Sequence, residues 1–247
     1  MLIVLFLAAV WAGAQNALAG GGSFVTLPAM MLTGLDARAA NIASTIALFP
    51  GQVTTGWVNR QLVEGAAGLG FWVLAGISLA GGVLGAGLLL VTPPVFFAHI
   101  VPWLVLFATG VFAYGRLARR RNSERRRLGP VTAGAAQFLI AIYGGYFGGG
   151  IGMLMLAALT AAGLAVRAAG STKNVLAGIM NAGAVALFAI LTPAIPWGRV
   201  AIVAAGAMAG GFAGAQMLRK IDERILSIMV IVLGIALTVG LFITAKR

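Results

Sequence analysis

The residues of this sequence that could do chemistry are concentrated in one stretch, Gly144–Asn174, which starts rich in glycine and ends polar. After an apolar run it carries Arg167 and then the segment Gly170-Ser171-Thr172-Lys173-Asn174. Backbone N–H groups, hydroxyls, a carboxamide and an ammonium group together favour the binding of an anion. We predict that Ser171 or Thr172 caps a helix here, with its positive end directed towards the glycines. The nucleotide-binding pattern G-x-x-x-x-G-K-[ST] is absent from the sequence.

A looser copy of this stretch lies upstream at Gly20–Thr45, where a glycine cluster is again followed by a short apolar segment and an arginine. Irregular backbone at membrane depth is tolerated only where it is buried in protein or lines a cavity. We therefore expect both glycine breaks to line one site. The glycines concerned are Gly20, Gly21, Gly22, Gly148, Gly149 and Gly150.

The arginines Arg38 and Arg167 follow the two glycine-broken segments at equivalent places. An intramembrane cation is retained where it has a function, although both could equally be interfacial arginines that extend to the lipid headgroups. The predicted substrate-binding residues are Arg38, Gln52, Arg167, Ser171, Thr172, Lys173, Asn174 and Asn181. We predict no catalytic residue, metal ligand or cofactor, because the five acidic residues lie in connecting segments and the chain has one histidine and no cysteine.

The composition is that of a polytopic membrane protein, since 61% of residues are hydrophobic and only 9% are charged. Soluble domains carry about 25% charged residues. The apolar stretches have the length of helices rather than of the ten-residue strands of a barrel. The 36 glycines favour closely packed helices. The fold class predicted is all-α, with about eight to ten membrane segments, some of them short, broken or re-entrant.

The expected segments follow one another along the whole chain. Residues 2–19 resemble a signal peptide but lack a basic region in front, so we expect a retained helix. Residues 22–34, interrupted by Pro28, and 151–165 are too short to span and are expected as half-helices or re-entrant arms. In the second arm, a break would depend on Gly152 or Gly163. The remaining predicted spans are 36–59, 68–91, 95–115, 131–147, 167–191, 198–218 and 225–244.

An internal duplication is indicated by landmarks that recur in nearly constant register. Ala80-Gly81-Gly82-x-x-Gly85-Ala86 recurs as Ala209-Gly210-Gly211-x-x-Gly214-Ala215, and Gln52 falls on Asn181. The predicted organisation is a first transmembrane repeat at 1–115, a basic loop at 116–130 and a second repeat at 131–247. The glycine pairs at a spacing of four predict helix packing. Counting Lys and Arg on each side favours inverted over parallel repeats, if the basic loop is cytoplasmic.

The basic loop contains seven arginines between Arg116 and Arg127, within a chain of net charge +12. Such a cluster can bind nucleic acid, but next to membrane spans it is typical of a cytoplasmic anchor. We expect its partners to be anionic lipid headgroups.

The paired glycine clusters, each followed by an apolar arm, a glycine and an alanine-rich segment, resemble the TauE/SafE family of sulfite and organosulfonate exporters. The resemblance covers nearly the whole chain, including the central basic loop. It implies a transporter of the bacterial inner membrane that exports small sulfur-containing anions. The alternatives left open are uptake or proton-coupled transport of such anions, and a membrane assembly protein that transports nothing. An enzyme would need paired carboxylates, metal ligands or a nucleophile with its base.

Overall fold

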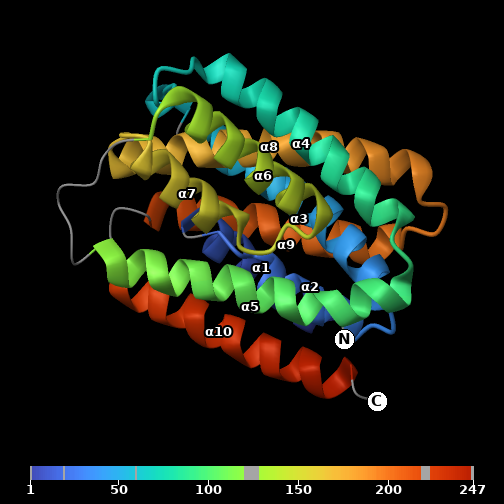
Figure 1. Cartoon of the computed structure of the whole chain (residues 1–247). Coiled ribbons are helices and arrows are strands. Elements are labelled where there is room, and N and C mark those ends of the chain that lie inside the picture. Colours follow the sequence, from blue (N-terminus) through green and yellow to red (C-terminus); the bar gives the residue numbers. More distant parts are fainter. Residues whose placement is uncertain (1, 19, 59, 120–127, 218–222, 246–247) are drawn as a thin grey trace.

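The computed structural model describes residues 2–18, 20–58, 60–119, 128–217 and 223–245 (Figure 1). Helices account for nearly all of the secondary structure in these ranges, as predicted. The helices are α1 (Leu2–Leu18), α2 (Ser23–Met31), α3 (Ala37–Val58), the 3-10 turn η1 (Arg60–Leu62), α4 (Phe71–Val91), α5 (Pro94–Arg119), α6 (Pro130–Tyr146), α7 (Ile151–Ala161), α8 (Val166–Leu191), α9 (Trp197–Met217) and α10 (Glu223–Ala245).

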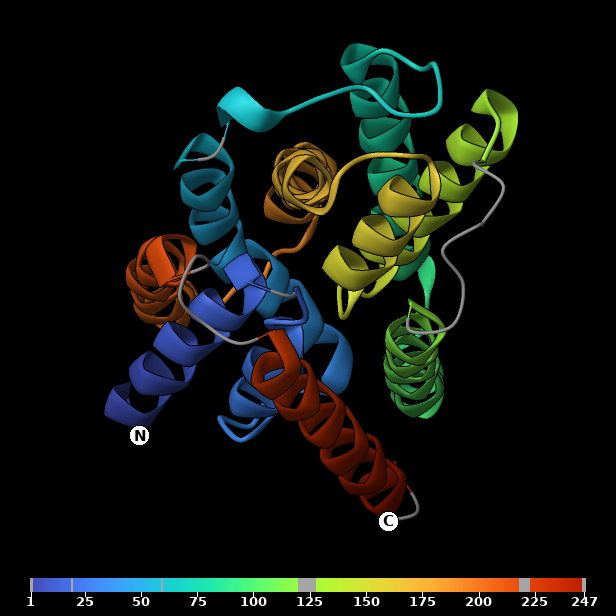
Figure 2. The ribbon, with the colours of Figure 1, turned by 90° about the vertical axis from the view of Figure 1, so that its left-hand side faces the viewer.

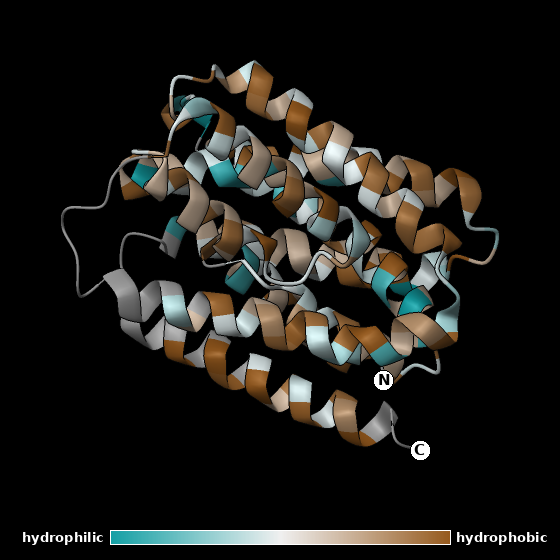
Figure 3. Ribbon diagram, viewed as in Figure 1, coloured by the Kyte–Doolittle hydropathy of each residue, from teal (hydrophilic) through white to brown (hydrophobic). Residues whose placement is uncertain are grey.

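Several helices are long and apolar enough to cross a membrane. In the described residues these are Phe71–Val91, Pro94–Val111, Val166–Leu191 and Trp197–Gln216. Hydrophobic residues cover most of α4, α5 and the described part of α10 (Figure 3). The hydrophobic residues therefore face outward as well as inward, which is the pattern expected where the surrounding solvent is lipid.

The two short helices, α2 with 9 residues and α7 with 11, do not reach across a membrane. Each ends at a glycine in the left-handed region, Gly34 with φ of 92° and Gly163 with φ of 101°. The expectation of an interruption at Pro28 was wrong, because this residue lies inside α2 and the helix runs on to Met31. Likewise Gly152 lies inside α7, so the break in the second arm depends on Gly163.

Glycine faces bring the long helices into backbone contact, which confirms the packing predicted from the paired spacings. A Cβ atom on Gly81 would lie 2.6 Å from Cβ of Ala141 in α6. On the other side of the molecule, a Cβ atom on Gly214 would lie 2.7 Å from Cα of Ala14 in α1. Helices α4 and α6 thus pack in the same manner as α9 and α1. The close approach leaves no room for larger side chains.

The connections between helices lie at two opposite ends of the molecule, and at each end hydrogen bonds join segments that are distant in the sequence. At one end, Arg38 Nη1 donates hydrogen bonds to the carbonyl oxygens of Leu90 at 3.2 Å and Thr92 at 2.7 Å. At the other end, the Glu64 N–H donates to Oγ1 of Thr172 at 3.0 Å. In Figure 1 the first group, with the α4–α5 and α8–α9 connections, lies on the right, and the α3–α4 connection lies on the left.

Substituting a glycine in these faces should destabilise the fold. In Gly210→Ala the new methyl group meets the carbonyl oxygen of Val10, so we expect a loss of about 1–3 kcal/mol in stability. The measurement is the midpoint of thermal unfolding of the purified protein in detergent. Gly87→Ala in α4 is the matched control, because no atom lies within 4 Å of its Cβ position. Equal midpoints for the two variants would contradict the packing argument.

Candidate functional site

A small polar cavity lies where four helices meet, and its volume is about 10 Å³. Helix α8, which contributes the charged residue of the lining, Lys173, lies between α3 on one side and α4 and α7 on the other (Figure 2). The lining residues are Asn16 of α1, Gln52 and Thr55 of α3, Ile151 and Gly152 of α7, and Lys173, Asn174 and Ala177 of α8.

The predicted glycine breaks form two tight turns beside this cavity. The first glycine turn is Gly20–Gly22, and the second glycine turn is Gly148–Gly150. Positive φ angles occur at Gly20 (80°), Gly21 (89°), Gly148 (79°) and Gly150 (77°), which L side chains rarely adopt. The remaining two glycines, Gly22 and Gly149, are buried in the same turns.

Each turn is held by a side chain from the helix that precedes it. Nε2 of Gln15 donates to the carbonyl oxygen of Gly21 at 3.3 Å. The Tyr143 hydroxyl lies 3.0 Å from the carbonyl oxygens of both Gly149 and Leu104, and its one hydrogen is shared between these two acceptors. The turns are therefore fixed parts of the structure, and they set where α2 and α7 begin.

The first glycine turn touches the start of α7. A Cβ atom on Gly152 would lie 2.9 Å from Cα of Gly20 and 3.2 Å from Nζ of Lys173. Only glycine at both positions allows this approach. The ammonium group therefore lies beside the first turn of a helix, where unpaired N–H groups carry partial positive charge.

Lys173 is the central residue of the site. Its side chain is 2% exposed, about two turns into α8. Among the described residues, its ammonium group makes no ion pair or hydrogen bond, and the carboxylates of Asp36 and Glu64 lie in connecting segments. A buried charge without a partner is strongly unfavourable. The positive end of α7 adds to the repulsion, so the position favours an anion as partner.

Neutral side chains complete the cavity. Asn181 Nδ2 donates to Gln52 Oε1 at 2.6 Å, which leaves the amide hydrogens of Gln52 free to donate towards the cavity. Asn174, 8% exposed, lies beside Lys173 in the lining. Thr55 donates its own hydroxyl hydrogen to the carbonyl oxygen of Gly51 at 2.8 Å. The set is thus rich in N–H donors and holds one full positive charge.

The structure brings only some of the predicted residues together. Gln52, Lys173 and Asn174 line the cavity, and Asn181 contacts it through Gln52. Arg38 binds the last carbonyl groups of α4, and Arg167 is exposed at the start of α8. Both arginines lie outside the lining.

The predicted helix cap at Ser171 or Thr172 was wrong. Helix α8 begins at Val166, so both residues lie in its interior, where backbone N–H groups are already paired. Gly170 is helical and breaks nothing. The Thr172 hydroxyl instead contacts the backbone of Glu64, accepting from its N–H at 3.0 Å. Ser171 is 5% exposed and is not part of the lining.

Two polar lining residues were missed in the sequence, Asn16 and Thr55. Asn16 is one of only two carboxamides in α1, immediately before the first glycine turn, and this isolated polarity in an apolar helix was a usable signal. Thr55 lies almost one helical turn after Gln52 on α3, so helical periodicity placed it on the same face.

The cavity as it stands has room for about one water molecule. An oxyanion with several oxygen atoms requires a larger space. The cavity as it stands is therefore smaller than such an anion.

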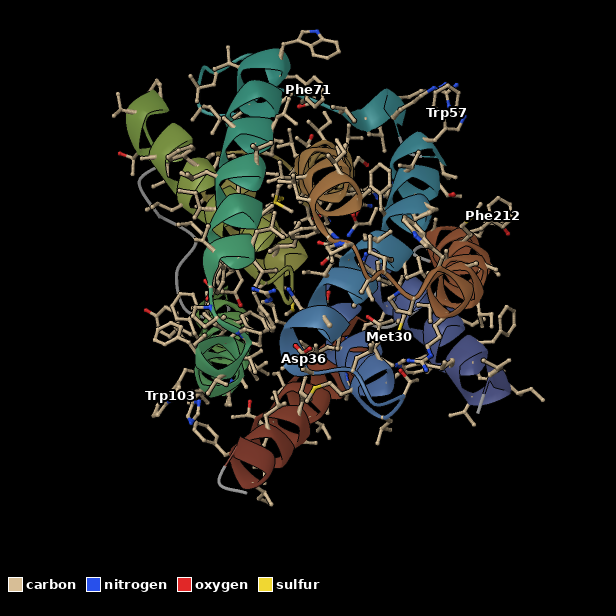
Figure 4. All side chains as sticks on the ribbon, turned by 90° about the vertical axis from the view of Figure 1, so that its right-hand side faces the viewer. Met30, Asp36, Trp57, Phe71, Trp103 and Phe212 are labelled. Atoms are coloured by element: carbon tan, nitrogen blue, oxygen red, sulfur yellow. The ribbon has the colours of Figure 1, made fainter. Side chains whose placement is uncertain are left out.

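Large exposed aromatic side chains surround the bundle, as Trp57, Trp103 and Phe212 point away from it (Figure 4). Together with the long apolar helices and the buried cation, this pattern defines a multi-pass helical membrane protein. Residues 5–241 match the family described as "Sulfite exporter TauE/SafE". The chain belongs to this family, as the resemblance of its glycine clusters indicated.

Relatives that match nearly the whole chain are described as probable membrane transporter proteins. The chain is 28% identical over 244 residues to a probable membrane transporter protein, ORF9, of Sinorhizobium sp., covering 98% of this chain and 92% of the relative. It is 26% identical to a probable membrane transporter protein of Haemophilus influenzae, covering 96% and 93%. It is 24% identical to the probable membrane transporter protein YfcA of Escherichia coli K12, covering 98% and 89%. No solved structure matches the chain.

These matches confirm the predicted class. The protein is a multi-pass bacterial membrane transporter, and the family it belongs to is one of transporters and not of enzymes.

The contact between Gly20 and Gly152 gives a test of the site. Gly152→Ala inserts a methyl group between the Gly20 backbone and Lys173, so we expect transport by this variant to fall at least about tenfold and stability to drop by about 1–3 kcal/mol. Gly178→Ala on α8 is the control, because its Cβ position is open, and it should transport at the wild-type rate. Wild-type transport by Gly152→Ala would show that this contact does not shape the site.

Proposed function

We propose that the protein exports small sulfur-containing anions, sulfite or short organosulfonates, through the cavity at Lys173. The observation that carries the proposal is the buried ammonium group of Lys173, which faces the start of α7 and has no carboxylate partner among the described residues. Family membership supports the substrate class, since the family's description names sulfite export.

The proposed binding mode pairs the anion's charge with Lys173 and its oxygen atoms with N–H donors. Gln52 and Asn174 supply carboxamide N–H groups, and Asn181 holds Gln52 in place. Each hydrogen bond to a charged group contributes about 1.5–3 kcal/mol. A sulfite or sulfonate group offers three oxygen atoms to these donors. Arg167, exposed at the start of α8, we assign to attracting anions to this end of the protein and not to direct contact.

The direction follows from the sign of the charge. A bacterial cell membrane is negative inside, so each negative charge experiences an outward driving force of about 2.3 kcal/mol per 100 mV. Among the described residues, no acidic residue lies beyond the first position of a membrane helix, so none is placed at membrane depth to carry a coupling proton. The potential alone is therefore sufficient to drive export in this proposal.

The testing experiment is flux from proteoliposomes loaded with sulfite, thiosulfate, taurine, sulfoacetate or acetate. We expect efflux of sulfite or a sulfonate, and we expect an inside-negative potassium diffusion potential to accelerate it. Efflux that ignores the potential and follows a proton gradient would contradict electrogenic export and favour proton-coupled movement or uptake. No flux of any sulfur anion would contradict the substrate class.

We further propose that the chain consists of two inverted repeats, α1–α5 and α6–α10. In support, the helix lengths run 17, 9, 22, 21 and 26 residues in the first half and 17, 11, 26, 21 and 23 in the second. The packing partners also exchange, since α1 packs on α9 as α6 packs on α4. Gln52 and Asn181, which the sequence register pairs, touch each other between the halves.

The repeats would have opposite orientations because equivalent residues lie at opposite ends. Arg38 near the start of α3 contacts the end of α4, whereas α8 starts beside Glu64, at the other end. By the positive-inside rule we assign the end with Arg60, Arg167 and the basic segment to the cytoplasm. Residues 120–127 of that segment lie outside the described residues. Its contact with anionic lipid stays a prediction.

Single-cysteine labelling tests this topology. The chain has no native cysteine, so Asp36→Cys and Arg167→Cys, both at exposed positions, give a clean background. In intact cells, we expect an impermeant thiol reagent to label position 36 and not 167. Labelling of 167 alone would reverse the proposed orientation, and labelling of both would contradict opposite ends.

A further inference from the structure

Buried oxygen atoms lie around the second glycine turn. In the proposed repeats, this position in one half corresponds to the Lys173 cavity in the other. A Cβ atom on Gly148 would have three oxygen neighbours: Gly144 O at 3.5 Å, Ser23 Oγ at 3.7 Å and Thr45 Oγ1 at 3.7 Å. These groups come from α6, α2 and α3 and lie on separate parts of the chain. The space beside Gly148 is therefore bounded by oxygen atoms and not by hydrocarbon.

Two side-chain oxygen atoms, one in this group and one on the neighbouring residue Asn41 of α3, have lone pairs that no described group uses. Asn41 is 1% exposed and donates from Nδ2 to the carbonyl oxygen of Tyr146 at 3.2 Å, which leaves its Oδ1 buried without a partner. Asn41 lies one helical turn before Thr45 on α3, and its amide reaches the segment that leads into Gly148. The Ser23 hydroxyl, with its residue 7% exposed, forms no hydrogen bond within the described part of the chain.

The carbonyl group of Gly144 adds to this set, because it lies in the last turn of α6, which ends at Tyr146, and no backbone bond from Gly148 caps it. At the end of α1, in the first half, the N–H of Gly20 donates to the carbonyl oxygens of Gln15 at 3.2 Å and Asn16 at 3.1 Å. The equivalent bond from Gly148 to Gly144 is not formed in the described residues. Terminal carbonyl groups carry the negative end of the helix dipole, and this one faces the oxygen cluster.

We propose that Ser23, Asn41, Thr45 and the Gly144 carbonyl oxygen form a binding site for a sodium ion. The Thr45 hydroxyl donates its hydrogen to the carbonyl oxygen of Asn41 at 2.9 Å, so its lone pairs are free for a cation. Calcium and magnesium sites draw on carboxylates, and none lies here, so a single positive charge fits the neutral oxygen set. Discontinuous helices whose carbonyl ends coordinate Na⁺ are a general device of secondary transporters.

The proposal does not depend on which anion the protein carries, and the two sites differ in chemistry. The Lys173 cavity presents an ammonium group and N–H donors beside a helix start. The oxygen cluster beside Gly148 presents acceptor oxygen atoms next to the end of a helix. Opposite charges would thus occupy equivalent places in the two halves.

The experiment measures radiolabelled Na⁺ binding to the purified full-length protein in detergent, with choline as the balancing cation. We expect saturable binding of one ion, and Thr45→Val and Ser23→Ala should each weaken it by about 10- to 100-fold. Thr45→Ser keeps the hydroxyl and should retain binding. Thr54→Val is the matched control, because Thr54 donates to Pro50 O at 2.9 Å on the same helix in the same manner but away from the cluster.

Anion flux by the same preparations shows that the variants are folded, and it separates this proposal from the proposed function. No saturable Na⁺ binding to the wild type, with water alone in the cluster, would overturn the sodium site even if anion export is observed. Binding that is equally strong in Thr45→Val and in Thr54→Val would also overturn it. Na⁺ binding in a protein without sulfite flux would leave the sodium site standing and remove the proposed substrate.

Discussion

The structure depends on one electrostatic constraint, the burial of Lys173 without a negative partner among the described residues. A charged residue inside a membrane helix costs about 2.5–3.5 kcal/mol on insertion scales, and the nearby start of α7 adds to that cost. A carboxylate close by would remove the problem and also remove the site, because the lysine would then be permanently paired. In the proposed function, an anion from solution is the group that pairs with this charge.

The glycine contacts follow from this constraint. For Lys173 to lie beside the first turn of α7, the first glycine turn and α7 must approach to backbone contact at Gly20 and Gly152. That approach requires the long helices to be close as well, and Gly81 and Gly214 provide it on α4 and α9. In lipid, small residues at helix interfaces replace the hydrophobic driving force that packs soluble proteins.

In the proposed repeat organisation, the two halves share a framework and differ in their buried side chains. Gln15 and Tyr143 hold equivalent glycine turns by hydrogen bonds to equivalent carbonyl groups. In the first half, however, Ser44 and Thr45 occupy the places that Lys173 and Asn174 take in the second, and Ser44 is hydrogen-bonded to Thr26. If the halves are repeats, as proposed, they share a geometry and differ in a few buried side chains.

The sequence predicted the helices well because long apolar runs, bounded by glycine and proline, have few other solutions in a membrane. It also pointed to Lys173, because a cation inside such a run is rare. It failed where tertiary contacts decide. Gly170 resembles a helix start in the sequence, but the helix begins earlier at Val166. Arg38 resembled a site residue, but its position beside the end of α4 depends on how distant segments pack.

The most direct test of the account is sulfite binding to purified wild-type protein and to Lys173→Met, which keeps a long side chain and removes the charge. If the ammonium group is the anion's partner, binding should weaken by about ten- to a hundredfold in Lys173→Met. The variant should also be at least as stable as the wild type without ligand, because an unpaired buried charge has been removed. Unchanged sulfite affinity in a folded Lys173→Met protein would contradict the central claim.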